Sequence, residues 1–170
     1  NVIASQDLSD FKTGAYATFD LSGQEEVRIV RLAGPYAVLN GVFFDATPGQ
    51  PVSYVGMDSS TQGDWKGVYG NAAAYIPGYS SNTLTLGPDY NTALDPNGNS
   101  VTVNVQNATP EVLSTKSRNK SALEISSGTS ASRIVSRLVA RADMTINLGF
   151  GDSVSHRVAV YLADTDTRNQ

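Results

Sequence analysis

Apolar and polar residues alternate along short segments of this chain, and this alternation restricts the fold more than any other feature. In residues 101–105, 144–148 and 156–163 an apolar side chain recurs at every second position. A period of two places those side chains on one face of an extended strand. Residues 27–32 and 37–44 are apolar on both sides, which predicts interior strands of a sandwich. The pattern therefore predicts a chain built of β-strands.

Glycine, proline, asparagine and serine separate the predicted strands, as in Ser22-Gly23 and Gly149-Phe150-Gly151. These residues favour tight turns between extended segments. Four shorter apolar segments predict further strands, over residues 2–5, 16–21, 52–57 and 83–86. About ten short strands joined by such turns predict an all-β fold, an antiparallel β-sandwich that is jelly-roll-like.

Two segments do not follow the alternation. Residues 132–141 carry apolar side chains at helical spacing, and their three arginines fall four positions apart, so periodicity alone favours a helix there. Residues 113–130 form a long polar connection, for which the sequence is compatible with a helical turn or with a loop.

Composition narrows the class of protein. The chain has 170 residues, the length of about one domain, so we expect residues 1–170 to form a single β-sandwich unit. Charged residues make up only 16% of the chain, and 15 glycines accompany many Ser, Thr and Asn, a profile typical of β-rich extracellular proteins. The net charge of −4 without clustered Lys or Arg argues against nucleic-acid binding. No apolar stretch approaches the roughly 20 residues of a membrane span.

Few residues are suited to catalysis. The chain has one histidine, His156, and no cysteine, so the usual nucleophile arrangements and zinc sites lack parts. A glycosidase needs two facing carboxylates. Asp58 and Asp64 are the candidate pair, six positions apart, but acidic residues in glycine-rich turns usually cap backbone N–H groups. We therefore expect no enzymatic activity and no cofactor.

One loop has part of a calcium-binding pattern. Asp95, Asn97 and Asn99 supply oxygen ligands at alternate positions, as at the start of a calcium loop. The twelfth position is Gln106, where such a loop needs a bidentate acid. A hairpin turn is the preferred interpretation, and the three residues are calcium candidates.

Residues 58–70, D-S-S-T-Q-G-D-W-K-G-V-Y-G, contain the only tryptophan, a tyrosine and three glycines. This segment resembles the D-T-T-T-Q-G-x-W-x-G-x-Y-G signature of a β-sandwich module that is repeated in large secreted bacterial proteins, some of which also carry glycoside-active domains. Residues 14–44, 132–134 and 155–168 are similar to further parts of that module. The resemblance implies a secreted, extracellular or cell-surface β-sandwich and favours a strand over residues 132–141. Thr165 departs from the module, which usually has an aromatic residue there.

The order of these parts differs from that of the module. Residues 1–46 resemble its closing part, whereas residues 50–170 resemble the opening part of the next module. About ten residues would then be missing between the two ends, the length of one strand. A sandwich without one strand exposes an apolar core and an unpaired edge, which a strand from a neighbouring copy can fill by donor-strand complementation. Repeated head to tail, that contact builds a filament. The alternative is that the sequence is one unit cut from a tandem array.

The sequence thus predicts a non-catalytic structural or adhesive repeat that associates with other copies of itself. The predicted assembly interface lies on the first residues and the last strand, at Val2, Ile3, Ala4, Val158, Val160 and Leu162.

The alternative function is that of a carbohydrate-binding module of a secreted, glycan-active protein. Sugar-binding sandwiches stack pyranose rings on exposed aromatic side chains and bind hydroxyl groups through Gln, Asn and Asp. The candidates are Trp65, Tyr69, Tyr75, Gln62 and Asp64. We expect Trp65 and Tyr69 instead to pack inward and fix the corner, and the exposure of Trp65 separates the two interpretations.

Overall fold

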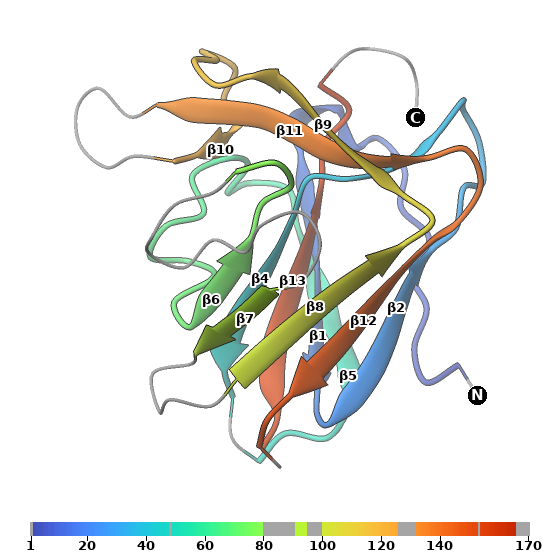
Figure 1. Cartoon of the computed structure of the whole chain (residues 1–170), viewed down its shortest axis with the longest axis vertical. Helices are drawn as coiled ribbons and strands as arrows, with labels where there is room; N and C mark the ends of the chain where they lie inside the picture. Colours follow the sequence, from blue (N-terminus) through green and yellow to red (C-terminus); the bar gives the residue numbers. More distant parts are fainter. Residues whose placement is uncertain are drawn as a thin grey trace.

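Antiparallel strands account for the fold of this protein (Figure 1). The computed structural model describes residues 2–47, 49–79, 91–94, 100–125, 132–152 and 154–165. Within these ranges the regular elements are β-strands and one 3-10 turn, η1 (Phe11–Thr13). The predicted all-β, antiparallel, jelly-roll-like sandwich is confirmed.

The first layer is a five-stranded sheet. Its strands follow the order β5 (Ser53–Asp58), β1 (Ala15–Leu21), β13 (His156–Leu162), β4 (Gly41–Ala46) and β6 (Ala73–Tyr75). The central strands β13 and β4 are buried along almost their whole length, as expected for strands that are covered on both faces.

The second layer consists of two four-stranded sheets. One has the order β2 (Gln24–Ile29), β12 (Met144–Phe150), β8 (Ser100–Gln106) and β7 (Asn91–Leu94). The other contains β3 (Ala37–Leu39), β11 (Arg133–Ala140), β9 (Thr109–Ser114) and β10 (Leu123–Glu124), and crosses the top of the sandwich in Figure 1. The chain passes directly from β2 to β3, from β8 to β9 and from β11 to β12, so the second layer is one surface that bends. The jelly-roll character lies in two pairs of strands that are distant in sequence. β1 pairs with β13 in the first layer, and β2 pairs with β12 in the second.

Two hydrophobic clusters cover the two faces of the five-stranded sheet. The inner cluster lies between the layers and includes Phe44, Ile146 and Val158. The outer cluster is centred on Tyr16, Phe43 and Tyr161, which are fully buried. Trp65 and Tyr69 of the signature segment and Ile125 after β10 pack against this outer cluster, so the signature segment lies over the outside of the sandwich.

The interior strand predicted over residues 27–32 is wrong. The structure has β2 there as an edge strand over residues 24–29, and its burial alternates. Val30 and Leu32 follow the strand and are exposed, at 48% and 71%. The three charged residues within β2 suit an edge position, because a strand covered on both faces has no place for them.

Residues 37–44 are buried, as predicted, but they form two strands and not one. Asn40 separates β3 from β4 and moves the chain from one layer to the other. Its side chain stabilises the break, because Asn40 Nδ2 donates to the Ser136 carbonyl at 2.9 Å and Oδ1 accepts the Ala163 amide at 2.7 Å.

The remaining segments give a mixed outcome. Residues 133–140 form strand β11, as the resemblance implied, because both faces of this strand are covered and periodicity then carries no information. Residues 2–5 form no strand, so that prediction is wrong. Residues 113–130 contain the end of β9 and the short strand β10, and residues 121–123 are buried. The strand predicted over residues 83–86 lies outside the described residues.

Candidate functional site

The signature segment begins where β5 ends, and Asp58 fixes its first turn. The Asp58 carboxylate accepts hydrogen bonds from the Ser60 amide at 2.7 Å, the Thr61 amide at 3.2 Å and the Tyr69 hydroxyl at 3.0 Å. Partial burial alone would raise the pKa of Asp58, but the hydrogen bonds from Ser60 and Thr61 outweigh it and hold the pKa well below its ordinary value. Burial, together with the hydrogen bond to Asp58, raises the pKa of Tyr69 to about 12.

Aromatic rings close this corner against the five-stranded sheet. Tyr69 stacks on Tyr16 with ring centroids 4.4 Å apart, and Trp65 packs on Phe43 at 4.8 Å. The Trp65 indole N–H donates to the Glu124 carbonyl at 2.9 Å. Both Trp65 and Tyr69 are half-buried, and each directs its polar atom to a partner within the protein.

Two glycines of the signature allow the loop to approach its neighbours. The Gly63 amide donates to the Lys120 carbonyl at 2.9 Å, and the Gly63 carbonyl accepts the Glu124 amide at 3.0 Å. A Cβ atom at position 63 would lie only 2.0 Å from the Ala122 carbonyl oxygen. Gly70 has a positive φ of 68°, which favours glycine. The signature therefore encodes a tightly packed corner.

Four of the five carbohydrate candidates lie together at this corner, namely Trp65, Tyr69, Gln62 and Asp64. Gln62 has a left-handed backbone with φ of 53°, and its carbonyl accepts the Tyr16 hydroxyl. Asp64 is exposed and pairs with Arg133. The fifth candidate, Tyr75, is 1% exposed and belongs to the inner cluster on the other face of the sheet.

A second feature is a cavity at the open edge of the sandwich, which we name the edge slot. It has a volume of about 800 Å³ and lies between the free edge of β2 and residues 2–11. Ala17, Phe19 and Leu21 of β1 form its floor, and residues 25–32 line it along β2. Phe19 is only half-buried, although it belongs to the inner cluster. The inner cluster is therefore incompletely covered at this edge.

The edge slot lies where both layers end in an edge strand. β5 ends the five-stranded sheet and β2 ends one four-stranded sheet in the described part of the chain, and Ser53 of β5 and residues 25–29 of β2 line the slot. β2 pairs only with β12 in the part of the chain that the structure describes, so its other edge keeps free N–H and C=O groups. On the inner face of β2, Val27 and Ile29 stay half-buried.

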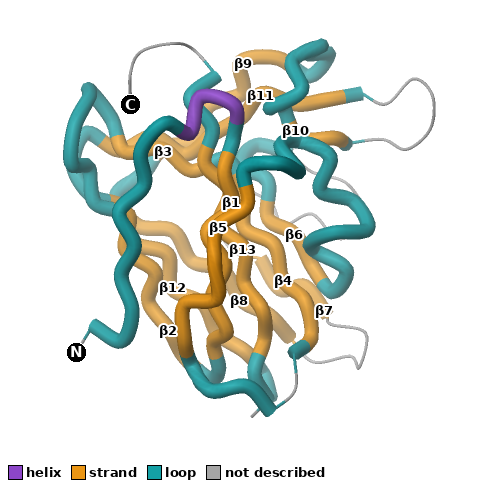
Figure 2. Tube along the Cα trace, turned by 180° about the vertical axis from the view of Figure 1, so that it is seen from behind, coloured by secondary structure: helices purple, strands orange, loops and turns teal. Residues whose placement is uncertain are grey.

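Residues 2–10 run alongside this edge without joining a sheet (Figure 2). Within the described ranges, no backbone hydrogen bond joins them to β2 or β5. Leu8 and Phe11 pack against the inner cluster, whereas Val2 and Ile3 are 80% and 59% exposed. The segment thus forms an outer wall of the edge slot and leaves its interior open.

The predicted assembly residues lie partly at this edge. Val2, Ile3 and Ala4 line the edge slot, as do Val160 and Leu162. Val158 is fully buried in the inner cluster. β13 itself is paired on both sides, with β1 and β4, so it offers no free edge. Sequence reasoning missed Phe19, Val27 and Ile29 as residues of this open edge. The charges within residues 24–29 could have indicated the edge, because such charges mark an edge strand.

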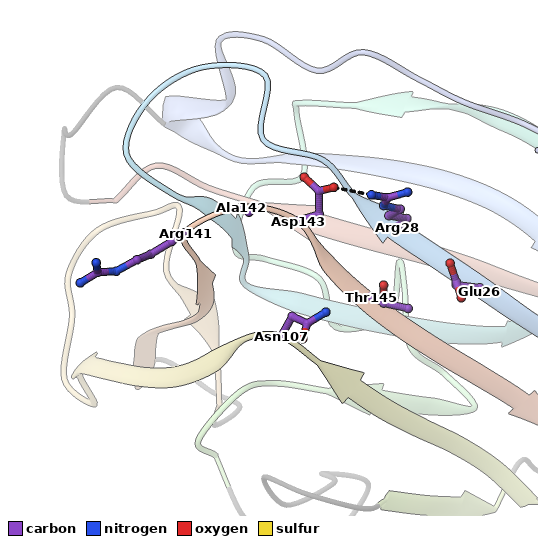
Figure 3. A pocket seen from close by; sticks show the side chains of 7 residues that line it. All are labelled: Glu26, Arg28, Asn107, Arg141, Ala142, Asp143 and Thr145. Atoms are coloured by element: carbon purple, nitrogen blue, oxygen red, sulfur yellow. Dashed lines mark hydrogen bonds and ion pairs between the residues drawn. The ribbon is translucent and has the colours of Figure 1, made fainter.

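A polar hollow of about 630 Å³ lies on the outer face of the second layer, where it bends (Figure 3). Arg28 pairs with Asp143 there, and the Arg141 side chain points away from the other labelled residues. Glu26 and Thr145 flank the ion pair. Opposite charges compensate each other across the hollow, so it presents no charge of one sign to a ligand.

His156 is buried at the start of β13. Its ring stacks on Phe150 with centroids 4.3 Å apart, and Nε2 lies 2.8 Å from the Asp152 carboxylate. These contacts give the histidine a structural role between β12 and β13.

The calcium candidates Asp95, Asn97 and Asn99 lie outside the residues whose side chains the structure describes. Among the described residues, no group of three or more His, Cys, Asp or Glu side chains is arranged to hold a metal ion. In the same part of the chain no helix has the length and hydrophobicity needed to cross a membrane.

No protein-family model matches this sequence, and searches of curated proteins and of solved structures give no significant match.

Proposed function

We propose that this protein is a non-catalytic structural or adhesive unit of the extracellular space or cell surface, related to the secreted module whose signature it resembles. It associates with other copies by strand complementation at the edge slot, as a filament or a tandem array. The observation that carries this proposal is the edge slot itself, a strand-sized cavity beside the free edge of β2.

The chemistry of the edge slot supports a strand as its occupant. β2 supplies six residues of unpaired edge, about 20 Å long at the usual rise per residue. Main-chain hydrogen bonds to such an edge provide affinity, and alternate side chains of the added strand then enter the apolar floor. Phe19, Val27 and Ile29 would lose their remaining exposure to water, which stabilises the complex.

Sedimentation velocity over a range of protein concentrations tests the proposal. We expect the wild-type mass to rise with concentration, and Val27→Lys to remain monomeric where the wild type assembles, since its charge would enter the edge slot. The matched control is Val112→Lys, because Val112 is also a valine on an edge strand, 45% exposed on β9, but lies outside the slot. A wild type that stays monomeric at every concentration would contradict the proposal.

Carbohydrate binding is the second candidate function, and the grouping of Trp65, Tyr69, Gln62 and Asp64 at one corner favours it. Part of the Trp65 indole remains accessible there. Glycan-array binding that Trp65→Ala abolishes, with the circular dichroism spectrum unchanged, would support a sugar site. Because Trp65 packs on Phe43 and bonds to Glu124, a loss of binding that accompanies unfolding counts against it.

A further inference from the structure

We infer that the strand that fills the edge slot is the N-terminal segment, residues 2–9, of a second copy of this chain. The inference rests on the proposed function and identifies the donor. A donor must be extended, free of other pairing, and able to leave its own molecule. Residues 2–9 meet these conditions, because they run along the surface and belong to no sheet.

The segment has the side-chain pattern of a donor strand. Its sequence is V-I-A-S-Q-D-L-S, in which Val2, Ala4, Gln6 and Leu8 fall on one face of an extended strand, three of them apolar. Val2 and Ile3 are among the most exposed large apolar residues that the structure describes. Of these two, Val2 lies on the same face as Ala4 and Leu8, so strand addition would cover the apolar surface that Val2 leaves unburied in its own molecule.

The segment is attached in a way that permits exchange. The Phe11 carbonyl accepts the Gly14 amide at 3.0 Å and the Asp164 amide at 3.2 Å, which anchors the chain at η1. Asp10, directly before this anchor, has a left-handed backbone with φ of 56°. The anchor holds the chain after the segment, so residues 2–9 can leave the outer wall of their own molecule while η1 and β1 stay in place.

Charges define one register between the donor and β2. β2 is antiparallel to β12, whose arrow in Figure 1 points downward, so β2 and the N-terminal segment both run upward in that view. We assign the donor segment of another copy the same direction. In a parallel register with Asp7 beside Arg28, the Asp7 carboxylate joins the ion pair of Arg28 with Asp143, and Arg28 lines the edge slot. Opposite charges on neighbouring strands stabilise such a pairing.

The same register also matches the apolar faces. Leu8 comes beside Ile29 on the inner face, over the floor of the edge slot. Ala4 and Ser5 come beside Glu25 and Glu26, so no acidic residue of the segment lies next to an acidic residue of β2. Charge complementarity thus favours a second copy over an unrelated peptide.

The first experiment removes the donor and then supplies it in trans. A variant without residues 1–9 should stay monomeric in sedimentation velocity at concentrations where the wild type assembles. A fluorescein-labelled peptide of residues 1–10 should bind this variant in fluorescence anisotropy, whereas a peptide of scrambled sequence should not. Because Leu8 packs on the inner cluster, the circular dichroism spectrum of the variant is measured first.

The second experiment tests the register in the full chain. Because Arg28→Asp also removes the ion pair with Asp143, the urea unfolding of each variant is measured first. Asp7→Arg and Arg28→Asp should each weaken association roughly fivefold, since each places like charges side by side. The double variant should recover most of the loss. Glu26→Gln is the matched control on the same face of β2, and we expect it to change association by less than about twofold.

The outcomes separate this inference from the proposed function. If the wild type assembles and the variant without residues 1–9 assembles equally well, another segment is the donor and the inference fails, whereas strand complementation stands. Absence of peptide binding, or a double variant that recovers nothing, overturns the inference in the same way. If the wild type never assembles, both proposals fail.

Discussion

The two faces of β1 differ sharply in how completely they are covered. On the outer face, Tyr16 is fully buried and lies under the signature corner, where the polar atoms of Trp65 and Tyr69 both bond within the protein. On the inner face, Phe19 is half-buried and borders the edge slot. One strand thus has a fully covered outer face, which we call the finished side, and an incompletely covered inner face, which we call the open side. The most specific sequence motif lies on the finished side.

This difference indicates how to interpret the signature. Asp58, Gly63, Gly70 and the aromatic rings of the signature take part in internal contacts at the corner, so these residue types are explained by folding alone. The edge slot has no comparable motif, because an open edge needs only free backbone groups and an apolar floor. A motif that is easily recognised can therefore mark the stability of a fold, whereas the surface available for association lies elsewhere.

The largest effect is expected from overfilling the finished side. Gly63→Val would bring side-chain atoms against the carbonyl oxygens of Ala122 and Lys120, which lie 2.0 and 2.6 Å from a Cβ atom at that position. We expect a loss of about 3 kcal/mol or more in the free energy of unfolding, measured in urea.

The control for this substitution is another glycine of the same loop. Gly67 has a φ of 79° but open space around a Cβ atom. Gly67→Ala should therefore cost only about 1 kcal/mol, the strain of the left-handed backbone. Equal losses at the two positions would show that the corner is not tightly packed at Gly63.

The next comparison uses the same truncation on both sides. Ile134→Ala removes a side chain that is 2% exposed in the outer cluster, and we expect a loss of about 3 kcal/mol. Ile29→Ala removes the same atoms from the half-buried edge of β2, and we expect about 1 kcal/mol. Urea unfolding at a concentration where the protein is monomeric measures both. Similar losses would mean that the edge slot is already closed.

The sequence predicted the class of fold because alternation and turns act locally. Strands β8, β12 and β13 follow directly from period-two patterns, and β1 and β5 from shorter ones. The inward packing expected of Trp65 agrees with its contacts to Phe43 and Glu124.

The sequence did not reveal properties that depend on tertiary neighbours. Residues 27–32 look like an interior strand when read alone, but whether a strand lies at an edge depends on which partners reach it. Tyr75 looks like a candidate platform for a sugar ring, yet its strand β6 buries it between the layers. Likewise, residues 2–5 have a β-like composition, and what they lack is a partner strand within the described chain. The position of the edge slot depends on which strands end the two layers, which no local pattern encodes.

The smallest effect concerns the pH dependence of the finished side. The pKa of Asp58 is lower in the folded than in the unfolded protein, so its contribution to stability is present above the unfolded value of about 4 and is lost as the pH falls towards the folded value. Asp58→Asn should therefore reduce stability at pH 7 and flatten its decline below about pH 4. Thr61→Val removes one hydroxyl donor to Asp58 and should flatten the decline only in part. Urea midpoints between pH 7 and pH 2 measure both changes. Because Asp58 does not line the edge slot, neither variant should alter the concentration at which the protein assembles. A change in that concentration would show that the two sides are coupled.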